Sequence, residues 1–152
     1  MKLTQHFSNA LTQGRPRAGL LLLCLAVVSI GALLLEGTQE SVVTLVVKSP
    51  MAGLDKLLHA GAHFWVASLI CWGLALLRPG RAAIWATVTL VLDGAAGIAT
   101  EYAQKWFGAS HGRQFDLQDV GANLAGTLIA LALFLTLALQ VQASQRQRPK
   151  TG

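Results

Sequence analysis

Residues 101–126, with the sequence EYAQKWFGASHGRQFDLQDVGANLAG, are rich in ionisable and amide side chains, yet they follow one apolar run and extend into the next. The runs, 82–100 and 120–141, are each close to the roughly 20 residues that cross a bilayer as a helix. Ionisable side chains at a membrane edge are unfavourable unless they pair with each other or with a ligand. The stretch therefore predicts two membrane helices joined by a short loop, with a polar site beside it.

Two further apolar runs, 18–35 and 57–77, precede this stretch. Charged residues make up 12% of the 152 residues, against about 25% in ordinary soluble domains. Together these features predict an all-α integral membrane protein with four transmembrane helices. The first run is longer than the roughly 7–15 apolar residues of a signal peptide, which favours an uncleaved helix. We expect one membrane domain over 18–141, with basic tails at 1–17 and 142–152.

The charges are divided between the two ends of these predicted helices. Eight of the twelve basic residues lie in the tails and in the turn at 78–81, whereas all seven acidic residues lie in the other half of the topology. The positive-inside rule then places both termini in the cytoplasm and the polar cluster at the extracytoplasmic end. The expected location is a bacterial cytoplasmic (inner) membrane. No basic-aromatic motif accompanies the net charge of +5, so nucleic acid is not an expected partner.

Three of the predicted helices carry a polar stripe. In chain order, the stripes are Asp55, His59 and His63; Asp93, Gly97, Glu101 and Gln104; and Asp116, Asp119, Asn123 and Thr127. At 100° per residue, the members of each stripe share one helix face. We expect the three faces to converge on a single site open to the outside. Asp93 lies about 12 Å below Glu101, because each helical residue rises about 1.5 Å.

Several of these residues also have a purely structural interpretation. Asp116 could cap the fourth helix, and Asn123 could link two helices by a hydrogen bond. Asp93 could pair with one of the histidines inside the bundle. The small residues of Gly94-Ala-Ala-Gly97 and Gly121-x4-Gly126 are expected to allow close helix approach. A buried network that only holds three helices together is thus one interpretation of the cluster.

Metal and nucleophilic chemistry have weak support in the sequence. His59 and His63 are spaced i and i+4, which suits a metal, and Asp93 or Glu101 could add ligands. No third histidine lies in a predicted helix, so no metal and no other cofactor is expected. The adjacent Ser110-His111 pair could suggest a nucleophile, but this pair in a glycine-flanked loop is typical of ordinary loop residues.

Acid–base chemistry uses the largest number of these polar residues. The candidate catalytic, proton-handling groups are His59, Glu101 and Asp119. Lys56 and Arg113 are candidates for holding an anionic group such as phosphate or carboxylate. The other expected ligand-binding residues are Asp55, Gln104, Asp116 and Asn123. Whether the protein is an enzyme is left open by these residues.

Two blocks of this region resemble the VanZ-like family of small bacterial membrane proteins, which is named after a teicoplanin-resistance factor. The blocks are Asp55-Lys56-x2-His59, and Glu101-x2-Gln104 followed by Arg113-x2-Asp116-x2-Asp119-x3-Asn123-x2-Gly126. The resemblance covers about residues 54–130. It implies an outward-facing polar pocket that binds or modifies a cell-envelope lipid or lipoglycopeptide, with a link to glycopeptide resistance. His63 and Asp93 lie outside the shared pattern, which weakens the metal interpretation.

A second class of function is compatible with the same residues. The chain could be a non-catalytic membrane subunit or scaffold of an envelope-synthesis or protein-sorting system, with another membrane protein as its partner. In that case the polar cluster is structural, and substitutions in it would lower protein abundance. A transporter is disfavoured because four helices leave little room for alternating access.

Overall fold

The computed structural model describes residues 15–36, 53–107, 109 and 114–146. These residues form four helices: α2 (Pro16–Glu36), α4 (Leu54–Leu77), α5 (Ala82–Phe107) and α6 (Leu117–Arg146). Each helix is long and apolar enough to cross a membrane, so the described part of the chain is all-helical and indicates a multi-pass membrane protein. Most of the tail at 1–17 and of the loop at 36–54, together with Ser110 and His111, lies outside the described residues.

Glycine and proline set the limits of α4. The helix follows Gly53, whose φ of 93° lies in the left-handed region that favours glycine. It ends at Leu77, before Pro79, which has no N–H to continue the ladder, and Gly80, which has a φ of 84°. The predicted turn at 78–81 is confirmed, and α4 begins three residues before the apolar run at 57–77.

Both α5 and α6 extend beyond the apolar runs that predicted them. The polar residues after position 100 continue α5 as far as Phe107. At the other end of the molecule, α6 runs to Arg146, so the start of the predicted tail at 142–152 is helical. Hydrogen bonding continues past the edge of an apolar run because polar side chains such as Gln are good helix formers.

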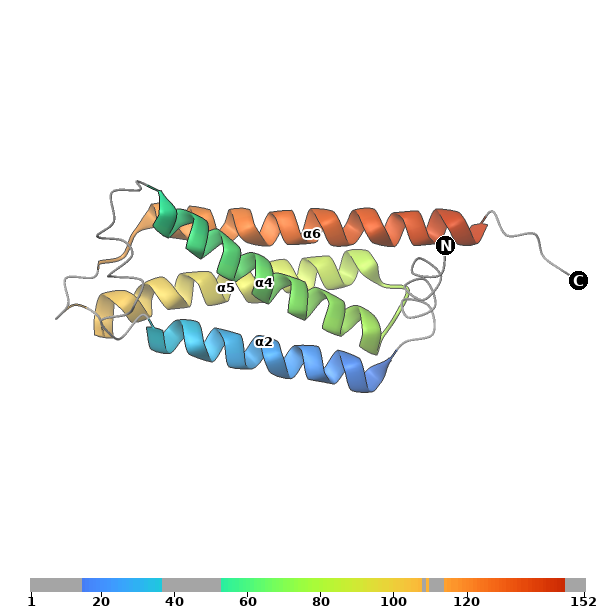
Figure 1. Cartoon of the computed structure of the whole chain (residues 1–152), viewed down its shortest axis with the longest axis horizontal. Helices are drawn as coiled ribbons and strands as arrows, with labels where there is room; N and C mark the ends of the chain where they lie inside the picture. The colour runs from blue at the N-terminus through green and yellow to red at the C-terminus, as the bar shows by residue number, and fades with distance from the viewer. Residues whose placement is uncertain (1–14, 37–52, 108, 110–113, 147–152) are drawn as a thin grey trace, which may run out of the picture.

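α4 makes the most extensive contacts in the bundle, chiefly with α6 and α2 and to a smaller extent with α5. In Figure 1 it crosses the bundle diagonally, from α6 near its beginning to α2 near its end. A small residue allows each of these approaches. A Cβ atom added at Gly126 would lie 2.0 Å from the backbone oxygen of Ala60, and one added at Gly19 would lie 2.8 Å from that of Gly73. The backbones of the paired helices are therefore in direct contact.

The glycines expected to permit close packing do so only in part. Gly97 and Gly126 face neighbouring helices, as the sequence predicts. The same expectation is wrong for Gly94 and Gly121, where an added Cβ would meet nothing within 4 Å. Gly121 is five residues, or about 140° of arc, from Gly126 and therefore lies on another side of α6. Gly94 is only about 60° from Gly97, but no described atom of a neighbouring helix approaches it.

The two ends of the bundle have different interiors. Where α4 ends and α5 begins, an apolar cluster fills the space: Cys71, Ala75, Ala86, Leu131 and Phe134. The ring of Trp72 packs edge-on against that of Phe134, with centroids 4.9 Å apart. At the opposite end, where α4 and α6 begin and α5 ends, buried polar side chains take the place of apolar ones. We call this second end the carboxylate end.

Candidate functional site

The three predicted polar stripes meet inside the carboxylate end. The residues that contact one another there, or line a common hollow, are Asp55, Lys56 and His59 of α4, Glu101 and Gln104 of α5, and Asp116, Asp119 and Asn123 at the start of α6. Of the residues predicted to form the site, Arg113 lies outside the described part of the chain. The rest are brought together by the crossing of α4 over α6.

The ammonium group of Lys56 is surrounded by carboxylates. Its Nζ atom lies 3.2 Å from Asp55 Oδ2 and 2.8 Å from Asp116 Oδ2, and it also forms an ion pair with Asp119 Oδ1. An ammonium has three hydrogens to donate, which matches these three acceptors. The charge of Lys56 is thus directed at protein groups, and its predicted role in holding an anionic ligand stays a prediction.

Asp116 has two roles at once. Its Oδ1 atom accepts a hydrogen bond of 2.7 Å from the backbone N–H of Gln118, so the predicted capping of the last helix is confirmed. Its other carboxylate oxygen accepts the bond from Lys56. The hydrogen bond from the Lys56 ammonium, followed by that from the Gln118 N–H, lowers the pKa of Asp116 below its ordinary value. This carboxylate is therefore ionised at neutral pH.

A polar hollow of about 410 Å³ opens at the carboxylate end. Its lining consists of Asp55, Lys56, Gln104, Gln114, Phe115, Asp116 and Asp119. Two further hollows, of about 210 and 390 Å³, lie at the opposite end, and Arg81 is the one ionisable residue among the described residues that line them. Ionisable groups therefore gather around the hollow at the carboxylate end.

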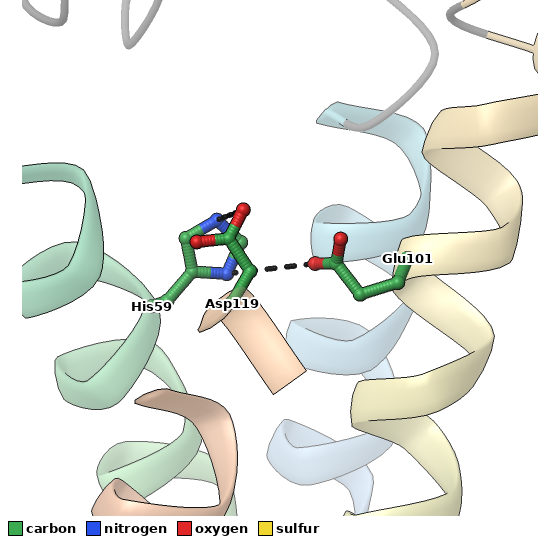
Figure 2. A group of neighbouring side chains, drawn as sticks. All are labelled: His59, Glu101 and Asp119. Carbon is green, nitrogen blue, oxygen red and sulfur yellow. Dashed lines mark ion pairs between the residues drawn. The ribbon is translucent and has the colours of Figure 1, made fainter. Parts of the chain in front are cut away.

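Three of the predicted catalytic residues point toward one another, as Figure 2 shows. They are His59, Glu101 and Asp119, one each from α4, α5 and α6, and we call them the shallow cluster. His59 Nδ1 lies 3.8 Å from Glu101 Oε1, and His59 Nε2 lies 3.7 Å from Asp119 Oδ2. Both distances exceed the roughly 2.7–3.2 Å of a hydrogen bond. The three side chains thus converge without bonding directly.

Glu101 is fully buried, yet only one of its two carboxylate oxygens is hydrogen-bonded within the described part of the chain. Its Oε2 atom accepts a long bond of 3.4 Å from the backbone N–H of Asp116. Its Oε1 atom has no hydrogen-bond partner among the described residues. Buried polar atoms are almost always bonded, so this oxygen is an exception that requires an explanation.

A second group of polar side chains lies deeper in the bundle. His63 Nδ1 lies 3.1 Å from Asp93 Oδ1, and the hydroxyl of Thr127 donates a bond of 2.5 Å to Asp93 Oδ2. All three side chains are buried, and we call them the deep cluster. The predicted pairing of Asp93 with a histidine is thereby confirmed. His63 does not belong to the group of potential metal ligands that the described residues form, which consists of His59, Glu101 and Asp119.

Asn123 lies between the two clusters. Its Oδ1 atom is hydrogen-bonded to His59 Nδ1 at 3.1 Å, which confirms the predicted interhelical link. A Cβ atom added at Gly97 would lie 3.2 Å from both Asn123 Cβ and His63 Cε1, so α5 approaches both groups closely here. The pattern of stripes did not indicate this separation into two layers, nor that Gln114 and Phe115 line the hollow. The one available signal for Gln114 and Phe115 was their position directly before the capping residue Asp116.

Comparison of the chain with protein-family models, with curated proteins and with solved structures finds no match.

Proposed function

We propose that this chain is a VanZ-like protein of the bacterial inner membrane whose hollow faces outward and binds the polar headgroup of an envelope lipid or lipoglycopeptide. One observation carries the proposal: polar groups from three helices converge around a single hollow at one end of an otherwise apolar bundle. Five of the polar residues that line the hollow belong to the two sequence blocks that resemble the VanZ-like family: Asp55, Lys56, Gln104, Asp116 and Asp119. The positive-inside charge distribution supports the outward orientation.

The outer surface at the carboxylate end favours an amphiphilic ligand. Leu57, Trp106, Phe107 and Leu117 are between 65% and 74% exposed, and they lie at the helix ends that surround the hollow. In a membrane these side chains face lipid, and aromatic residues are typical of the interface. A ligand could therefore place its acyl chain against this surface while its headgroup enters the hollow.

The walls of the hollow favour hydrogen-bond donors on the headgroup. Three aspartates line it against the one ammonium of Lys56, so its described lining presents mainly acceptors. Hydroxyl and amino groups of a sugar or a glycopeptide donate to such carboxylates. In this proposal Lys56 holds the aspartates in place, and the shallow cluster beneath them is the part of the site that would modify a bound ligand.

The test is purification of the full chain in native lipid, followed by mass spectrometry of the molecules that co-purify. We expect one class of envelope amphiphile to be enriched with the wild-type protein. Asp119→Asn should reduce that enrichment about tenfold, because it weakens charge-assisted hydrogen bonds. Gly121→Ala is the matched control, since the added methyl group meets nothing within 4 Å. A lipid composition identical to that of the bulk membrane would contradict the proposal.

Glycopeptide resistance and orientation are tested in cells. Expression of the chain should raise the teicoplanin concentration needed to inhibit growth, and Asp119→Asn should remove this effect at unchanged abundance. In a cysteine-free background, Gln114→Cys should react with an impermeant thiol reagent added from outside. Labelling only from the cytoplasmic side would contradict the outward orientation.

A structural scaffold is the second candidate, and the deep cluster favours it. The two carboxylate oxygens of Asp93 are both hydrogen-bonded across helices, as expected of residues that only hold a bundle together. If the shallow cluster has the same role, Asp119→Asn will lower abundance and resistance in proportion. Protein quantity measured beside the phenotype therefore distinguishes the two candidates.

A further inference from the structure

The unbonded oxygen of Glu101 is aimed at the shallow cluster. Glu101 is fully buried. Its Oε1 atom has no hydrogen-bond partner among the described residues, and in the described ion pairs it faces His59 Nδ1, which lies 3.8 Å away. A buried carboxylate oxygen without a partner is strongly unfavourable unless a cation or a proton neutralises it. The environment of Glu101 therefore requires one of these two.

The tautomer of His59 indicates which of the two is present. An amide oxygen only accepts hydrogen bonds, so the bond between His59 Nδ1 and Asn123 Oδ1 places the hydrogen on Nδ1. In the neutral imidazole, Nε2 then carries a lone pair, and it faces Asp119 Oδ2 at 3.7 Å. Two acceptors at this distance repel each other unless a cation or a second ring proton lies between them. Histidines that bind metals are commonly held by such a hydrogen bond on the remote nitrogen.

The spacing of the three side chains suits a metal ion. One ligand atom from each of His59, Glu101 and Asp119 lies within 4.8 Å of the others. Tetrahedral zinc, with bonds of about 2.0–2.2 Å, sets its ligand atoms roughly 3.3–3.5 Å apart. The 3.7 Å from His59 Nε2 to Asp119 Oδ2 is only slightly longer than that value. The 3.8 Å to Glu101 Oε1 is measured from the other ring nitrogen, Nδ1, so Oε1 must move closer to Nε2 for the three side chains to share one ion.

The surrounding charge also favours a cation. Around the shallow cluster, the described residues place the carboxylates of Asp55, Glu101, Asp116 and Asp119 against the single ammonium of Lys56. A divalent cation would offset this excess of negative charge more completely than Lys56 does alone. It would also bring Glu101 Oε1, the unpartnered atom, into a bond.

We propose that His59, Glu101 and Asp119 bind a divalent transition-metal cation of the zinc class beneath the hollow. One imidazole and two carboxylates suit such a cation, whereas magnesium and calcium prefer oxygen ligands alone. Three protein ligands leave a coordination position for water or for a group of a bound molecule. This inference goes beyond the proposed function and does not depend on the envelope ligand. It differs from the sequence prediction of no metal, because carboxylates from two other helices replace the missing third histidine.

The test measures zinc binding by the purified full chain in lipid nanodiscs, after treatment with a chelator and its removal. Calorimetric titration with zinc chloride and elemental analysis should give about one zinc per chain, as for a single three-ligand site. Glu101→Gln keeps the shape of the side chain but removes a charged ligand, and we expect about a 100-fold loss of affinity. His59→Gln, at a more exposed position, should cause a similar loss. It keeps the proposal testable if Glu101→Gln does not fold.

Asp55→Asn is the matched control, because it removes the same charge beside the same hollow but lies outside the three-residue group. We expect it to change zinc affinity by less than about threefold, since a partly exposed charge is screened. Equal losses in Asp55→Asn and Glu101→Gln would show diffuse attraction to an acidic surface and overturn the proposal. Absence of zinc binding, with an infrared band of a protonated carboxyl that disappears in Glu101→Gln, would overturn it in favour of a proton.

Discussion

The shallow and deep clusters contain the same kinds of side chain on the same helix faces, yet they differ in how their polar atoms are bonded. In the deep cluster, His63 and Thr127 each bond to one oxygen of Asp93. In the shallow cluster, Glu101 keeps a buried oxygen without a partner among the described residues. The difference indicates that the deep cluster is complete as a structural unit, whereas the shallow cluster has a carboxylate oxygen that the described residues leave unbonded.

The largest expected effect is that of Asp93→Ala. This change leaves His63 and Thr127 buried without their shared partner, and breaking a buried pair in this way costs about 3–5 kcal/mol. The loss should appear as a lower unfolding temperature in detergent and as lower abundance in the membrane. If Asp93→Ala lowers the unfolding temperature no more than an exposed substitution does, the deep cluster is not structural. The distinction between the two clusters would then not hold.

Gly126→Ala should be the next most damaging change. The added methyl group would lie 2.0 Å from the backbone oxygen of Ala60, so α4 and α6 must separate. Overpacking of this kind costs about 1–3 kcal/mol. Because both clusters join α4 to α6, we expect loss of stability and of zinc binding together. The control is Gly121→Ala on the same helix, which should be neutral or slightly stabilising in the same thermal unfolding assay.

Glu101→Gln should separate function from stability. It removes a charge from a site where one carboxylate oxygen has no partner, so we expect the free energy of unfolding in metal-free protein to change by less than about 1 kcal/mol. Zinc binding should be lost at the same time. The comparison with Asp93→Ala is the informative measurement: equal destabilisation by the two substitutions would mean that both clusters are structural.

The smallest effect concerns the pH dependence that Asp116 confers. Its pKa is lowered in the folded protein by Lys56 and by the Gln118 N–H, so its contribution to stability is present above the unfolded pKa and is lost as pH falls through the folded pKa. Asp116→Asn should therefore flatten the acid side of a plot of unfolding temperature against pH. Lys56→Met should flatten it partly, because the Gln118 bond remains. An unchanged acid limb in both variants would contradict this assignment.

The sequence predicted the helices well because their signals are local. The lengths of the apolar runs and the breakers at Pro79 and Gly80 depend on a few consecutive residues. Helical periodicity was likewise enough to place Asp119 and Asn123 on one face of α6. These predictions needed no knowledge of how the helices pack.

Other features depend on how the helices cross, and these were not predictable. Gly121 and Gly126 look alike in the sequence, but only Gly126 lies where α6 meets α4. The separation of His59 from His63 into different clusters also follows from the positions of Asn123 and Asp93 on neighbouring helices. Such pairings depend on the relative heights and rotations of three helices, which no single run of residues encodes.

The apolar packing around Trp72 and Phe134 marks where the polar part of the bundle interior ends. Polar side chains extend from the hollow down to the deep cluster, and beyond them the described residues form an apolar layer. In a membrane, such an apolar layer would keep the polar end from opening to both sides of the bilayer at once.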